Sequence, residues 1–118
     1  MVYMLMIYCD EADWAYKSPD ELVPTLAAHK SLEDDMRAAG KFCGGGGLAL
    51  TDSAKTVRFR GGKATVVDGP FAETKEQFGG FYLVEAETID EALAYARRIP
   101  GVENRDIEVR AVTHYSPL

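Results

Sequence analysis

Two side chains on one predicted helix are the first candidates for chemistry. Residues 19–39 have the apolar spacing of an amphipathic helix that ends at Gly40. Its apolar arc of about 120° is formed by Leu22, Leu26, Leu32 and Met36. His29 falls inside this arc, and Glu33 follows one turn later, so both side chains should face the sheet. The pair fits a stabilising contact, a base with its orienting carboxylate, or two metal ligands.

Asp10 is the third candidate, because it directly follows the predicted first strand, residues 2–9. A strand that runs into a loop often places a side chain in a cleft near the next helix. Asp10 is then either a site residue or one of several solvated carboxylates in "CDEAD". A metal site is not predicted, because His114 is the only other histidine and no Cys-x-x-Cys motif is present.

A charged loop, "DGPFAETKEQFGG", separates two predicted strands. Asp68, Gly69 and Pro70 have the composition of a tight turn. Phe71 and Phe78 bracket an otherwise polar segment, and aromatic anchors in such positions usually bury themselves against a neighbouring surface. We predict that the loop is a clasp against a partner subunit or a rim of the pocket.

The remaining pattern predicts a single α+β domain over residues 1–118. The expected strands are residues 2–9, 41–50, 56–60, 63–68, 80–86 and 107–112, and the helices are residues 19–39 and 89–99. This order, β-α-β-β-β-β-α-β, is ferredoxin-like with a central hairpin turning at Gly61-Gly62. The run "GGGG" has no Gly-Lys-Ser or Gly-Lys-Thr after it, so close strand packing explains it better than phosphate binding.

The strands "VYMLMIY" and "FYLV" are apolar on both faces, whereas two helices can cover only one face of a sheet. A second copy of the chain is the simplest cover, and it would form a homodimeric α+β barrel. The alternative is an aromatic-rich sheet exposed to solvent, which is rare on monomers.

Composition excludes several partners. The formal charge of -6 argues against a nucleic-acid-binding surface. The apolar N-terminal run is too short to span a membrane and has no basic flank or cleavage site, so we expect a cytoplasmic protein with Cys9 and Cys43 reduced.

Nearly the whole chain resembles the DGPF-type branch of the YCII-related proteins. The resemblance rests on "DGPFAETKEQFGGFYLVEA", "YMLMIYCDE", "MRAAGKFCGGGGLAL" and the helix "TIDEALAYARRIP". It implies a ferredoxin-like fold that forms dimeric α+β barrels. The family's proposed active site pairs an acid after the first strand with a helical His, which Asp10 and His29 match here, with Leu32 and Gly40 at the family's spacing.

The resemblance leaves two functional hypotheses. One relative is a dehydrochlorinase of chlorinated hydroxyhydroquinones, which implies a lyase or isomerase that abstracts a proton from a small aromatic or lactone-like molecule without a cofactor. His29 would be the base, and Asp10 or Glu33 would orient its ring. DGPF-type members are often encoded near extracytoplasmic-function sigma factors, which implies instead a non-catalytic module that binds a small molecule or a regulatory partner.

Overall fold

The computed structural model describes residues 1–117. Within them the elements are β1 (Val2–Cys9), η1 (Glu11–Asp13), α1 (Pro19–Ala38), β2 (Phe42–Gly47), η2 (Thr51–Ser53), β3 (Lys55–Arg60), β4 (Lys63–Asp68), β5 (Gln77–Glu85), α2 (Ile89–Ala96), η3 (Val102–Asn104) and β6 (Asp106–Ala111). The predicted ferredoxin-like α+β order with an added hairpin is confirmed. In this part of the chain neither α-helix is both long and apolar enough to cross a membrane.

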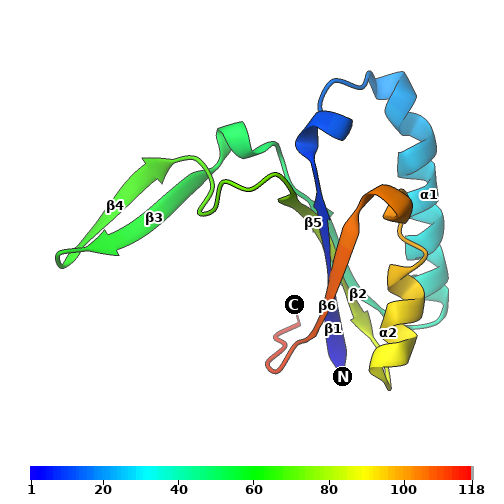
Figure 1. Ribbon diagram of the computed structural model, residues 1–118. Helices are drawn as coiled ribbons and strands as arrows, with labels where there is room; N and C mark the ends of the chain where they lie inside the picture. The colour runs from blue at the N-terminus through cyan, green and yellow to red at the C-terminus, as the bar shows by residue number, and fades with distance from the viewer. Residues whose placement is uncertain (118) are drawn as a thin grey trace.

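Four strands form the main sheet in the order β2-β5-β1-β6, and every neighbouring pair is antiparallel. Both α-helices lie on the same face of this sheet (Figure 1). Alternate residues of β1, namely Tyr3, Leu5 and Ile7, point into the core beneath the helices. Leu5, Met36, Val84 and Ile99 are the largest fully buried side chains, and burial of each contributes about 1.5–3 kcal/mol.

The helix α1 begins and ends on strong local signals. The Ser18 hydroxyl accepts from the Glu21 N–H, and the Glu21 carboxylate accepts from the Ser18 N–H, which completes a capping box. Gly40 has φ 71° directly after the helix, as expected of a residue that ends one. The prediction of this helix is therefore confirmed to within one residue.

The helix α2 is shorter than predicted, because it ends at Ala96 rather than at residue 99. The chain tightens into i to i−3 hydrogen bonds there, from Arg98 N–H to Tyr95 and from Ile99 N–H to Ala96. Ile99 remains in the core although it has left the helix. The apolar spacing therefore continues past the end of α2, which is why the predicted helix was too long.

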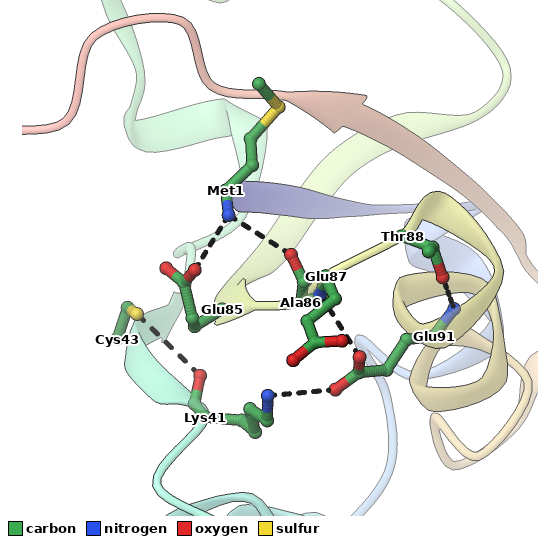
Figure 2. A network of polar contacts seen from close by, with 8 residues as sticks. All are labelled: Met1, Lys41, Cys43, Glu85, Ala86, Glu87, Thr88 and Glu91. Atoms are coloured by element: carbon green, nitrogen blue, oxygen red, sulfur yellow. Dashed lines mark hydrogen bonds and ion pairs between the residues drawn. The ribbon is translucent and has the colours of Figure 1, made fainter.

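Polar contacts join the N-terminus to the end of β5, and they join Lys41, just before β2, to the first turn of α2 (Figure 2). The Met1 amino group donates to Glu85 Oε1 at 2.7 Å and to the Ala86 carbonyl at 3.1 Å. Lys41 Nζ lies 3.3 Å from Glu91 Oε1, in the first turn of α2. This ion pair raises the pKa of Lys41 and contributes to lowering that of Glu91. These contacts lie at the end of the sheet where β1 begins and β5 ends.

Strand β5 begins at Gln77, three residues earlier than predicted. Tyr8 pairs with Phe78 and Ile7 pairs with Gly80, so a β-bulge lies between them. Gly79 and Gly80 lie inside the strand at this bulge. The DGPF loop between β4 and β5 therefore spans residues 69–76 and is shorter than predicted.

The hairpin β3–β4 leaves the body as an arm on the side away from the helices (Figure 1). Its predicted register is confirmed: Val57 pairs with Val66, Phe59 with Ala64 and Arg60 with Lys63. The arm raises the radius of gyration to 16.0 Å, against about 13 to 14 Å for a compact domain of this length.

The second face of the main sheet is only partly covered. Met4, Met6 and Tyr8 alternate with the core residues of β1 and are of intermediate exposure. After β6 the chain turns back to β2, where the Tyr115 hydroxyl donates to the Cys43 carbonyl at 3.2 Å. Cys9 is buried and Cys43 is half-buried, and their reduced state stays a prediction.

Candidate functional site

A cavity of about 380 Å³ lies between α1 and one end of the main sheet. Its volume is in the range of small-molecule sites. The sheet contributes Ile7, Cys9 and Tyr82, α1 contributes His29 and Glu33, and Trp14 and Arg105 come from the flanking loops. The helix wheel placed Leu26 in the core, but its side chain is 63% exposed and lines this cavity. Part of the apolar arc of α1 therefore faces the cavity instead of the core.

Glycines make the sheet side of the cavity, because Gly45, Gly46 and Gly47 of β2 line it together with Gly79 and Gly80. A Cβ at Gly45 would lie 2.7 Å from Tyr82 Cδ1 and 2.8 Å from the Phe81 carbonyl oxygen. The sequence prediction that "GGGG" reflects close strand packing is thus supported at Gly45. Here the missing side chain makes room for Tyr82.

Within the cavity His29 contacts Tyr82, with 2.7 Å between His29 Nδ1 and the tyrosine hydroxyl oxygen. Burial is the main cause of the raised pKa of Tyr82, and the negative charge of the nearby Glu33 adds to it. In the tautomer in which His29 Nδ1–H donates to the hydroxyl oxygen, the lone pair of the ring is on Nε2.

Arg37 is the charged neighbour of Glu33. Its Nη1 lies 3.7 Å from Glu33 Oε2, one helical turn further on. The Arg37 guanidinium in turn covers the Phe42 ring at 4.4 Å from its centre. The negative charge of Glu33 is therefore balanced by a cation that also packs on an aromatic ring.

The imidazole of His29 favours its neutral form. Burial is the main cause of its lowered pKa, the nearby Arg105 charge lowers it further, and Glu33 opposes the change. A neutral imidazole with a free Nε2 is the form that accepts a proton. The site thus holds a base ready for use at neutral pH.

The structure does not bring Asp10 into this group. Asp10 is not among the residues that line the cavity, and its Oδ1 accepts from the Ala12 N–H at 3.0 Å as the cap of η1. Of the three predicted catalytic residues, the cavity therefore brings together His29 and Glu33 only.

Residues 69–76, the part of the DGPF loop between β4 and β5, do not line the His29 cavity. Gly69 and Pro70 border a second hollow of about 310 Å³, together with Thr51 and Gln77. Asp68 pairs with Lys55 across the hairpin, and the turn is set by Gly69, whose N–H donates to Ala54 and whose φ is 104°.

The two aromatic residues predicted to bracket the loop, Phe71 and Phe78, differ in how far they are packed against other residues. Phe78 packs in the sheet, with its ring centre 5.5 Å from that of Tyr8 and 6.4 Å from that of Phe81. Phe71 is 81% exposed and lines neither hollow. The prediction that Phe71 packs on a partner subunit stays a prediction.

Sequence reasoning missed Tyr82, Trp14 and Arg105. Tyr82 lies in the apolar run "FYLV", and the register with β1 would have placed it under α1. Trp14 and Arg105 lie in loops, where no periodic pattern indicates a direction. Among residues 1–117 no three His, Cys, Asp or Glu side chains are arranged to hold a metal ion.

The lowered pKa of His29 predicts a pH-dependent stability. Between that value and about 6.5 in the unfolded chain, the unfolded state binds more protons, so stability falls as pH falls through this window. His29→Gln should remove that part of the slope. Urea unfolding of both proteins between pH 5 and 7.5, with a histidine NMR titration, checks it; equal slopes would contradict the neutral, buried imidazole.

Two comparisons relate this chain to known proteins. The model of the YCII-related domain matches residues 1–116. The uncharacterised protein R00369 of Rhizobium meliloti (strain 1021) is 35% identical over 122 aligned positions, which cover 99% of this chain and 96% of that protein. Because the family model matches almost the entire length and the relative is 35% identical over nearly the whole of both chains, the chain belongs to the YCII-related domain family.

Proposed function

We propose that the His29 cavity is the active site of an enzyme that abstracts a proton from carbon in a small aromatic or lactone-like molecule. The observation that carries the proposal is the 2.7 Å contact between His29 Nδ1 and the Tyr82 hydroxyl inside a cavity of ligand size. The contact orients the ring. We assign to Tyr82 the orienting role for which the sequence suggested Asp10 or Glu33.

The chemistry needs only groups of this chain and of the substrate. His29 Nε2 takes the proton, and the electron pair of the broken C–H bond moves into the conjugated system of the substrate. An elimination follows where that pair expels a neighbouring leaving group, and an isomerisation follows where the proton returns to another carbon. A substrate that stabilises its own carbanion requires no cofactor.

Deuterium exchange tests the proposal without knowledge of the physiological substrate. A panel of butenolides and chlorinated hydroquinones is incubated with the protein in D₂O, and loss of C–H signals is followed by NMR. His29→Ala should slow exchange by about 10² to 10⁴-fold, and Tyr82→Phe should cause a smaller loss because the base remains. Lys30→Ala, an exposed substitution on the same helix, is the control.

Asp10→Asn distinguishes a site built on His29 and Tyr82 from one built on His29 and Asp10. We expect exchange close to that of the wild type, because the Asp10 carboxylate caps η1 and does not line the cavity. A loss as large as that of His29→Ala would restore the His29 and Asp10 pair, and exchange that persists in His29→Ala would overturn the proposal.

The alternative is a non-catalytic binding module that uses the same cavity or the DGPF loop. It is favoured by the position of Asp10, since the acid expected beside the histidine is used as a helix cap. In that case compounds of the panel bind but do not exchange, and His29→Ala changes affinity alone.

We also propose that the chain works as a homodimer. The hairpin supports this, because Val57, Phe59 and Val66 lie on one face of it and are 65–68% exposed. A two-stranded hairpin with such a face is marginally stable alone. Its charge supports a second copy as the partner: four basic residues and one acid give residues 55–68 a net charge of +3, so the rest of the chain carries −9.

A further inference from the structure

Arg105 is a charged residue of the cavity that has no charged partner within residues 1–117. It lines the cavity from the loop before β6. The ion pairs among residues 1–117 do not include it. A guanidinium beside an apolar cavity is a ready partner for an anionic group.

The backbone at Gly101 makes room for this guanidinium. A Cβ at position 101 would lie 3.2 Å from Arg105 Nε and 3.5 Å from Cζ, and Gly101 has φ 77°. Both the close approach and the left-handed conformation favour glycine at this position. Arg105 is thus packed against backbone rather than free in solvent.

The other charges of the cavity are already matched. Glu33 is the only carboxylate in the lining, and its ion-pair partner is Arg37. Apart from His29, Arg105 is the only basic side chain in the lining. One guanidinium suits a monoanion such as a carboxylate better than a phosphate dianion, which usually collects several donors.

We propose that Arg105 anchors the carboxylate of a small ring compound in this cavity. The volume of about 380 Å³ and the side chains of Trp14, Leu22, Leu26 and Phe81 suit a planar ring. Arg105 and His29 line the same cavity, so a carboxylate anchored at Arg105 holds the ring in the cavity that contains the imidazole. This deepens the proposed function, on which the identification of the ligand as a substrate rests.

Trp14 provides the measurement, because it is the only tryptophan of the chain and it lines the cavity. Its fluorescence is titrated with benzoate, 4-hydroxybenzoate and 2-furoate, each against its neutral carboxamide, and with phenyl phosphate. We expect at least one carboxylate to bind tenfold or more tighter than its amide and than phenyl phosphate. Arg105→Gln should remove that preference.

Arg110→Gln is the matched control, because it makes the same change at an exposed arginine of β6 outside the cavity. Arg105→Lys keeps the charge and should bind the carboxylate more weakly than the wild type but more tightly than Arg105→Gln. It keeps the test decisive if Arg105→Gln does not fold.

The outcomes separate this inference from the proposed function. Carboxylate binding that depends on Arg105 supports the anchor even if no substrate exchanges deuterium. Equal binding of acids and amides across the panel, equal binding by wild type and Arg105→Gln, or tighter binding of phenyl phosphate would overturn it.

Discussion

Phe59→Glu converts a dimer into a folded monomer if the hairpin is the arm that holds two copies together. Phe59 is 68% exposed on the apolar face of a hairpin that extends from the body (Figure 1). Removing this ring from an interface costs about 2 kcal/mol, and a symmetric dimer loses the contact twice. The dissociation constant should therefore rise about 10³-fold.

Light scattering at micromolar concentration measures the change. The wild type should have twice the chain mass of 13.0 kDa, and Phe59→Glu should have that mass once. Thr65→Glu is the matched control, because Thr65 pairs with Arg58 and lies on the opposite face of the hairpin from Phe59. A dimer that survives Phe59→Glu would exclude the hairpin as the holding element, and a wild-type monomer would exclude the barrel.

The fold could be predicted from the sequence wherever a local signal was unambiguous. The Gly61-Gly62 turn set the register of the hairpin, and Thr88 with Glu91 set the start of α2. These features depend on residues close in the chain, so one sequence is enough to determine them. The bulge between Ile7 and Tyr8 depends on how β5 pairs across the sheet, and no local pattern indicates it.

The candidate site was predicted only in part, because local patterns indicate some of its residues and contacts across the sheet determine the others. The helical period turned His29 and Glu33 toward the sheet, which needs only the geometry of α1. Tyr82, which contacts His29, is 53 positions away from it in the sequence and meets it only after the sheet forms. Asp10 was predicted from its place after β1, but the first residues of the loop form a 3-10 turn that uses its carboxylate as the cap.

Gly45→Ala should be among the most destabilising single methyl additions in this chain. The new Cβ would lie 2.7 Å from Tyr82 Cδ1 and 2.8 Å from the Phe81 carbonyl oxygen. Tyr82 is buried and the carbonyl belongs to the neighbouring strand, so neither can move freely. Overpacking of this kind costs about 1–3 kcal/mol, and relief by movement of Tyr82 would break its contact with His29.

The neighbouring glycines supply the controls in the same strand. A Cβ at Gly47 meets nothing within 4 Å, and one at Gly46 makes only an ordinary contact of 3.6 Å with Phe81. Urea unfolding should therefore show a clear loss for Gly45→Ala and little change for Gly47→Ala and Gly46→Ala. The histidine NMR signal of His29 should shift in Gly45→Ala alone, because only that methyl group reaches Tyr82. Equal midpoints for the three variants would mean that β2 and β5 are not packed as closely as Gly45 indicates.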